Sequence, residues 1–173
     1  MRKFFVSFVS FLFISSCAHS RGPMAMATLA PTTDQTAKGT MHFTDAGEGN
    51  VEVQVDLTGV PPGTHGFHIH EKGDCGNNAN NAGGHFNPMN MVHGAPDAVS
   101  HHAGDFGNVT AEANGEVHTR FTTHSISLKA GDATNPVGHA VVLHANPDDL
   151  VSQPSGNAGA RIACGVIQTM SGM

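Results

Sequence analysis

The sequence lacks tryptophan and tyrosine altogether, and only 13% of its 173 residues are charged. Helical bundles and coiled coils are rich in Ala, Glu, Lys, Leu and Arg, so this composition argues against both classes. Basic residues are especially few: eight Lys and Arg stand against 14 Asp and Glu, which gives a net charge of −6. No block of basic residues occurs, so we expect no nucleic-acid partner.

Long apolar runs are also absent. The apolar stretch at residues 4–14 is too short to span a bilayer and has the length of the apolar part of a secretory signal. It follows the basic residues Arg2 and Lys3, as the core of a signal peptide does. We therefore predict that residues 1–16 are a signal peptide and that the protein is exported.

Cysteine is scarce, and the first of the three cysteines has a distinctive context. Residues 14–17 read Ile-Ser-Ser-Cys, which resembles a bacterial lipoprotein signal in which the cysteine, here Cys17, carries lipid. Residues 17–23 would then be a lipidated tether ahead of a domain at 24–173. This predicts a protein of the bacterial periplasm or cell envelope that is anchored to a membrane only through lipid on Cys17. Ordinary cleavage near Ala18 is the alternative.

An odd number of cysteines in an exported protein needs an explanation. If Cys17 carries lipid, Cys75 and Cys164 remain, and an oxidising compartment favours a disulfide between them. Two free thiols are the alternative.

Glycine and proline, by contrast, are plentiful, with 21 and 9 residues, and they separate short segments with strand patterns. Residues 50–58 alternate apolar and polar side chains without a break, as a half-buried strand does. Asn114 and Gly115 predict a hairpin between strands at 109–112 and 116–122. Further strand signals occur at 40–44, 140–144 and 161–167. We therefore predict an all-β fold, an antiparallel sandwich or barrel of about eight strands.

Two segments, 73–107 and 146–160, do not fit this pattern. The first has no apolar run and is rich in Gly, Asn, His and Pro. Long connections without secondary structure in a compact domain are often functional. We therefore expect the chemistry of the protein in these two segments.

Histidine is the residue in excess, with 13 copies. His68 and His70 are two positions apart at the end of a predicted strand, so both side chains project to one face. The segment that follows contributes more imidazoles and one carboxylate, and His144 ends a later strand. Imidazoles with one carboxylate suit zinc or copper, whereas calcium and magnesium prefer oxygen ligands. The additional candidates are His85, His93, His101, His102, Asp105 and His144.

These residues lie in five ordered motifs: GFHIHE at 66–71, GHFNP at 84–88, HGAP at 93–96, GDFGNV at 104–109 and GNAGARIACGVI at 156–167. In order and length the motifs resemble those of copper/zinc superoxide dismutase, and the resemblance extends from about residue 24 to residue 167. It implies an eight-stranded antiparallel Greek-key barrel with two long functional loops. It also implies dismutation of superoxide to O₂ and H₂O₂ by a histidine-ligated copper that cycles between Cu(II) and Cu(I).

The resemblance assigns a role to individual residues. It implies copper ligands at His68, His70, His85 and His144, and zinc ligands at His85, His93, His102 and Asp105, so that His85 bridges the two metals. Asp148 would orient metal ligands, Arg161 would dock the superoxide anion, and His85 would deliver a proton. Cys75 and Cys164 would form the disulfide.

Some features depart from the family or leave alternatives open. Residues 146–160 contain no lysine to steer superoxide, and Lys72 is the only nearby substitute. A surface copper- or zinc-binding module without turnover is the alternative function. Relatives are often homodimers, but no interface is readable from these residues. We expect no catalytic role for four surplus histidines, namely His65, His118, His124 and His139, and we assign none to His101.

Overall fold

The computed structural model describes residues 22–170, which form eight β-strands and one short 3-10 helix. No helix within 22–170 has the length and apolar character that crossing a membrane requires. The predicted signal peptide (1–16) and the lipidation site Cys17 lie outside the described residues. The strands are β1 (Met24–Pro31), β2 (Lys38–Gly47), β3 (Asn50–Thr58), β4 (Gly63–His70), β5 (Asp105–Ala111), β6 (Val117–Thr123), β7 (Ala140–His144) and β8 (Arg161–Met170), and the helix is η1 (Asn80–Ala82).

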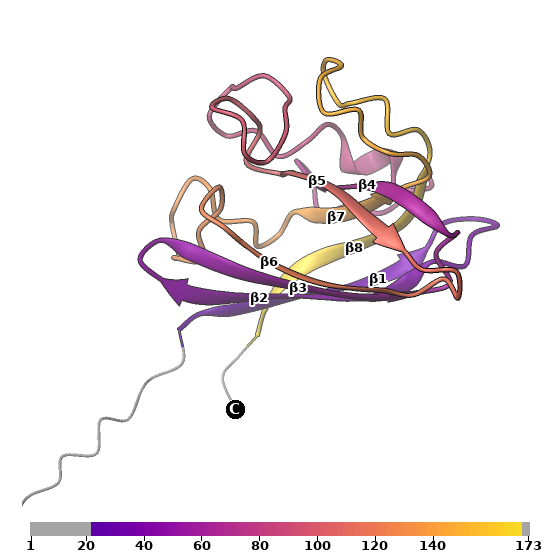
Figure 1. Ribbon diagram of the computed structural model, residues 1–173. Helices are drawn as coiled ribbons and strands as arrows, with labels where there is room; N and C mark the ends of the chain where they lie inside the picture. Colours follow the sequence, from indigo (N-terminus) through magenta and orange to yellow (C-terminus); the bar gives the residue numbers. More distant parts are fainter. Residues whose placement is uncertain (1–21, 171–173) are drawn as a thin grey trace, which may run out of the picture.

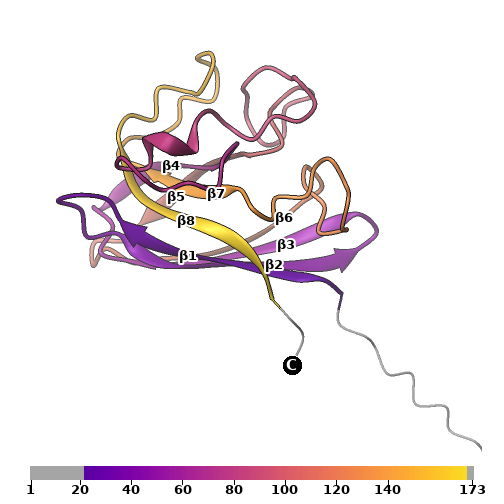
Figure 2. The same cartoon turned by 180° about the vertical axis from the view of Figure 1, so that it is seen from behind.

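All strand pairs are antiparallel, and the order across the sheet is β5-β4-β7-β8-β1-β2-β3-β6. Figures 1 and 2 show that this sheet curls into two layers, with β4, β5 and β7 in one and β1, β2, β3 and β6 in the other. Strand β8 joins the layers because it pairs with β7 on one side and with β1 on the other. The predicted all-β, eight-stranded antiparallel barrel is therefore confirmed.

The core fills the space between the two layers. The alternation in residues 50–58 places four apolar side chains of β3 inward, all at most 2% exposed, and leaves the polar residues between them partly exposed. They belong to one cluster with Phe43 of β2 and Phe67 of β4. Full burial of one such side chain contributes about 1.5–3 kcal/mol to the stability of the fold. The barrel is therefore a stable support for the loops. The inward residues of β3 are Val51, Val53, Val55 and Leu57.

The turn at Asn114–Gly115 forms, but the strands on either side do not pair. Gly115 adopts a positive φ of 80°, and its N–H donates to the carbonyl of Glu112 at 2.9 Å. The N–H of Glu112 also donates to the carbonyl of Glu116 at 2.9 Å, but beyond this pair β5 pairs with β4 and β6 pairs with β3, so the predicted hairpin pairing does not continue along the strands. Phe106 of β5 and Phe121 of β6 meet edge to face with ring centroids 5.4 Å apart. Both strands turn apolar side chains into the core between the layers, which separates their backbones.

Two long segments leave the β4-β5-β7 layer on the side away from the other layer (Figure 1). One joins β4 to β5 and the other joins β7 to β8. The first covers residues 71–104, so it begins and ends slightly earlier than the predicted 73–107, and it contains η1. A disulfide between Cys75 and Cys164 ties it to β8, which confirms that pairing. Closing a loop across 89 positions contributes about 4–5 kcal/mol in the chain-entropy model.

Candidate metal centre

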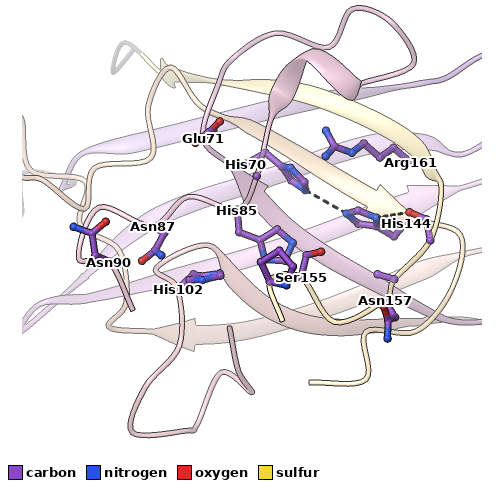
Figure 3. A pocket seen from close by; sticks show the side chains of 14 residues that line it. His70, Glu71, His85, Asn87, Asn90, His102, His144, Ser155, Asn157 and Arg161 are labelled. Carbon is purple, nitrogen blue, oxygen red and sulfur yellow. Dashed lines mark hydrogen bonds between the residues drawn. The ribbon is translucent and has the colours of Figure 1, made fainter. Parts of the chain in front are cut away.

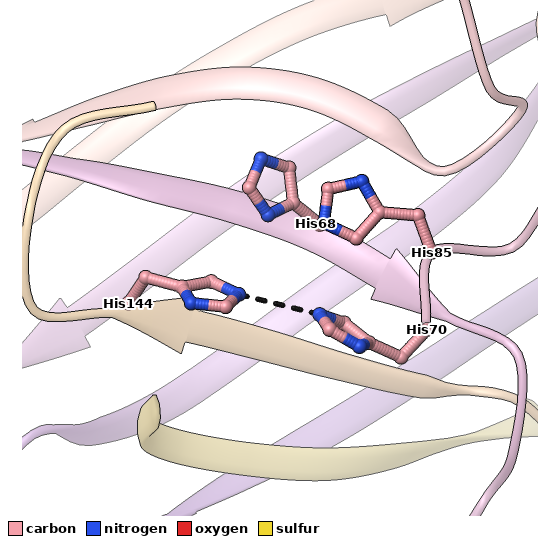
Figure 4. Close-up of side chains that lie close together, drawn as sticks. All are labelled: His68, His70, His85 and His144. Atoms are coloured by element: carbon pink, nitrogen blue, oxygen red, sulfur yellow. Dashed lines mark hydrogen bonds between the residues drawn. The ribbon is translucent and has the colours of Figure 1, made fainter. Parts of the chain in front are cut away.

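Four buried imidazoles converge where β4 meets β7. His68 and His70 are on one face of β4, and the antiparallel register places them beside Val142 and Ala140 of β7, the strand that ends at His144. His85 joins them through an isolated bridge to His70. Each residue offers a ring nitrogen, and the four atoms lie within 4.8 Å of one another (Figure 4). We call His68, His70, His85 and His144 the strand group.

Hydrogen bonds fix the orientation of two rings in the strand group. His70 Nδ1 donates to the carbonyl of Gly83 at 2.9 Å, and His144 Nδ1 donates to that of Gly159 at 3.2 Å. In the neutral ring the other nitrogen, Nε2, then carries the lone pair. These two Nε2 atoms lie 3.2 Å apart, joined by the dashed line in Figure 4. A cation between them would accept both lone pairs.

A second set of ligand-type atoms gathers around Asp105, the first residue of β5. His85 Nδ1 lies 2.7 Å from Asp105 Oδ1, and His102 Nδ1 lies 3.1 Å from the same oxygen. His93 Nδ1 lies 3.1 Å from Asp105 Oδ2. One ligand atom from each residue lies within 4.8 Å of all the others. We call His85, His93, His102 and Asp105 the loop group; His85 belongs to both groups.

Three ring nitrogens in these groups are buried without a hydrogen-bond partner among the described residues: His68 Nδ1, His85 Nε2 and His93 Nδ1. Leaving a buried polar atom unpaired costs about 1–3 kcal/mol. The proximity of His93 Nδ1 to Asp105 lacks hydrogen-bond geometry, so these two atoms do not satisfy each other. The three orphaned atoms are satisfied if each binds a metal ion, so the residues fit two metals.

Asp148 connects the two groups from behind. His68 Nε2 donates to Asp148 Oδ2 at 2.7 Å, and His93 Nε2 donates to Asp148 Oδ1 at 3.0 Å. Both rings therefore turn their Nδ1 lone pairs inward. The residue is itself held, because the backbone N–H of Asp148 donates to Asn108 Oδ1 of β5 at 2.7 Å. Asp148 lies in the β7–β8 segment and His93 in the β4–β5 segment, so their hydrogen bond also fastens one long segment to the other.

The electrostatics keep His68, His70 and His144 neutral and the carboxylate of Asp105 charged. Burial lowers the pKa of His68 to about 4 and that of His144 to about 3, and it lowers the pKa of His70 well below its ordinary value. Burial by itself raises the pKa of Asp105, but hydrogen bonds from His85 and from the backbone of His102 outweigh it and lower that pKa strongly. At neutral pH the centre therefore offers free lone pairs and one negative ligand.

A cavity of about 450 Å³ opens onto this centre. His70, His85, His102 and His144 reach its wall, and Arg161 lies beside His70 and His144 (Figure 3). The guanidinium of Arg161 donates to the carbonyls of Ala79 and Gly83 at 2.5 and 2.6 Å. Burial lowers the pKa of Arg161, but a guanidinium remains cationic at neutral pH. A small anion entering the cavity meets this charge next to the imidazoles.

Lys72 and the surplus histidines lie outside the two groups. One surplus histidine, His65, nevertheless has a structural role that the sequence did not predict. Lys72 is exposed and paired with Glu71 at 3.7 Å. His118 lies on the surface against Asp56, as expected for a residue without a catalytic role. His65, however, is only 3% exposed, and its ring nitrogens lie 2.9 Å from the carbonyl of His144 and 2.7 Å from that of Pro61. It supports the backbone of a strand-group residue, and no sequence pattern distinguishes it.

Comparison with known proteins agrees with this geometry. Residues 37–167, most of the chain, match the family described as copper/zinc superoxide dismutase. A solved structure titled as a crystal structure analysis of the clock protein EA4 is 39% identical, with a TM-score of 0.77. That match covers 87% of this chain and 97% of the other. A barrel with two buried histidine groups, matched by the family over this range, identifies the chain as a member of the copper/zinc superoxide dismutase family, which binds copper and zinc.

Proposed function

We propose that the strand group holds copper, that the loop group holds zinc, and that the protein converts two superoxide anions into O₂ and H₂O₂. One observation carries the proposal: two buried histidine groups share His85 and open into a single cavity beside a cation, Arg161. Bound copper would supply the one-electron exchange, alternating between Cu(II) and Cu(I), while zinc, which keeps one oxidation state, would hold the loop group together.

The choice of metal for each group follows from its ligands and its access. The strand group offers four imidazoles, which tolerate both oxidation states of copper, and three of its members line the open cavity. The loop group adds the carboxylate of Asp105, and a site with three His ligands and one Asp ligand suits zinc. His85 offers Nδ1 toward Asp105 and leaves Nε2 for the strand group, which supports its role as the shared ligand.

Arg161 binds the substrate anion and places it beside the strand group. The net charge of the chain is −6, so a local cation must overcome a repulsive field. Arg161 is held by two carbonyls and does not need to reorganise when the anion arrives. Asp148 fixes the ring orientation of His68 and His93.

His85 also moves a proton. Its Nε2 is buried, its ring lines the cavity that Arg161 also lines, and its Nδ1 is held at Asp105. We assign His85 to hold a proton at Nε2 whenever that nitrogen is not a copper ligand, and to pass it to the peroxide as the second superoxide is reduced. Water must supply the second proton of H₂O₂.

The test uses the purified full chain with one copper and one zinc bound, checked by metal analysis. Arg161→Ala should keep both metals and the disulfide but lose about 10-fold to 1000-fold in kcat/KM, and its remaining rate should depend less on salt. Arg120→Ala, which removes an exposed arginine of β6, is the control and should behave as wild type. A metal-replete wild-type protein without dismutation would instead identify a metal-binding module without turnover.

We further propose that residues 1–16 direct export and that lipid on Cys17 anchors the protein to a membrane. The support is the sequence alone: the short apolar run and the Ile-Ser-Ser-Cys motif. One acyl chain binds a membrane only marginally, so stable anchoring requires several chains on Cys17. Intact mass of the mature protein tests this. An unmodified N-terminus beyond residue 17 would contradict it, and Cys17→Ser should release the protein or block its processing.

A further inference from the structure

A second cluster of metal-ligating side chains lies outside the buried centre. It surrounds a shallow cleft of about 230 Å³ between the β4–β5 segment and the end of β6. Two thioethers and two imidazoles line this cleft, together with small or apolar side chains, and no carboxylate does. None of its residues belongs to the strand group or the loop group. The lining residues are Met89, Met91, Val99, His101, Ala103, His124 and Ser125.

The two methionines sit on a turn that is fixed by a side chain. Asn87 Oδ1 accepts the N–H of Met91 at 2.9 Å, and Asn87 Nδ2 donates to the carbonyl of Met91 at the same distance. The side chains of Met89 and Met91 are nevertheless 62% and 40% exposed, so they contribute little to the core. A rigid turn thus presents two polarizable sulfur atoms to solvent.

The orientation of His101 leaves one nitrogen free to act as a ligand. Its Nδ1 donates to the carbonyl of His102 at 2.8 Å, so Nε2 carries the lone pair in the neutral ring. Nε2 lies 3.5 Å from Ser125 Oγ, which is a long contact on the cleft wall. His124, the neighbour of Ser125, is exposed at the same cleft and supplies the second imidazole.

We propose that this cleft binds a soft monovalent cation, Cu(I), through the thioethers of Met89 and Met91 and the imidazoles of His101 and His124. Thioether sulfur selects Cu(I) over harder cations, and imidazole suits copper as well. The absence of a carboxylate from the lining removes the ligand that calcium and magnesium require. The cleft shares no residue with the strand group or the loop group, so it is a separate copper site at the protein surface.

The experiment uses the full chain with copper and zinc already bound, and Ag(I) as a redox-silent probe for Cu(I). We expect one Ag(I) per chain to bind without release of copper or zinc, measured by metal analysis after gel filtration. With methyl-labelled methionine, the NMR signals of Met89 and Met91 should shift and that of Met170 should not. Competition with a Cu(I) chelator then measures the affinity for Cu(I) itself.

The double variant Met89→Leu/Met91→Leu keeps the apolar volume and removes both sulfur atoms, so the fold should be unaffected. It should weaken Ag(I) and Cu(I) binding at least 10-fold, and His124→Gln should weaken it as well. Met170→Leu, which changes another exposed methionine (37%), is the matched control and should bind as wild type. Unchanged binding in the double variant would overturn the proposal and leave the cleft as an apolar surface, as would Ag(I) uptake only by displacement of the buried metals.

Discussion

The strand group and the loop group share His85 but are positioned by different means. His68, His70 and His144 are at the ends of paired strands, where backbone hydrogen bonds set their spacing before any metal arrives. His93 and His102 lie in a connection, and their places depend on side chains: Asp105 accepts the backbone N–H groups of His102 and Gly94 at 2.8 and 3.1 Å. One site is therefore preformed by the barrel, whereas the other is completed by a carboxylate.

The largest effect that we expect is on the stability of the metal-free protein at low pH, where the strand histidines become protonated on unfolding. The lowered pKa values of His68 and His144, about 4 and 3, mean that the unfolded chain binds protons below about pH 6.5 while the folded chain does not. Stability is then fully present above about pH 6.5 and is lost as the pH falls toward 4. Each pKa unit corresponds to about 1.4 kcal/mol, so we expect metal-free protein to lose on the order of 5 kcal/mol between pH 7 and pH 4.

Urea unfolding of metal-free protein across this pH range checks the prediction. His118 is an internal contrast, because the hydrogen bond to Asp56 raises its pKa and its small contribution is lost as the pH rises. If the free energy of unfolding stays level from pH 7 to pH 4, the strand histidines bind protons in the folded chain as readily as in the unfolded chain, and the pKa values are not lowered.

Removing the carboxylate of the loop group should break that group alone. Asp105→Ala leaves three imidazoles around an unanchored segment and takes the partner from a buried charged network, which costs about 3–5 kcal/mol. We expect zinc to be lost first, copper to be retained, activity to persist in part, and the protein to unfold more easily.

Metal analysis and thermal unfolding measure these effects, with Asp97→Ala, an exposed carboxylate of the same segment, as the control. If copper leaves first, or if both metals stay with unchanged stability, the assignment of Asp105 to zinc is wrong.

Asp148 touches both groups, so its variant compares them directly. Asp148→Asn keeps the size of the side chain but accepts only one of the two N–H groups that His68 and His93 donate. Losing such a contact typically lowers metal affinity about 10-fold to 100-fold. The loss should be greater for zinc than for copper, because His93 has no paired strand to hold it. Competition with chelators for each metal gives the two affinities, and equal losses would show that strand pairing gives His68 no advantage.

The smallest expected effect tests the support beneath His144. His65→Leu removes the ring that lies against the carbonyls of His144 and Pro61 and donates its N–H to one of them, at a cost of about 1–2 kcal/mol in the free energy of unfolding. Copper content and the copper absorption band should change while zinc content does not. His42→Leu, a partly exposed histidine of β2, is the control. If the variant loses zinc instead, His65 supports the loop group and not the strand group.

Much of this arrangement could be predicted from the sequence. Alternation located β3, and the spacing of two residues placed His68 and His70 on one face. The end of a predicted strand made His144 a candidate, but only the resemblance to a known family joined it to His68 and His70. Asp148 came from that resemblance alone, since nothing in the local sequence links it to residues some 80 positions earlier. Backbone partners could not be predicted: the carbonyls of Gly83 and Gly159, which orient His70 and His144, belong to residues without side chains. The separation of β5 from β6 was missed because a turn motif reports local geometry and not which layer each strand joins.

The pairing of β1 with β8 affects how fast the chain folds. Met24, at the start of the described chain, is opposite Met170, at its end, so the sheet cannot be completed until the last strand is available. Barrels built on such distant contacts fold in milliseconds to seconds, slower than helical proteins of similar size. The strand group is incomplete without His144, which ends β7, so we expect metal to bind there only after β7 has paired with β4.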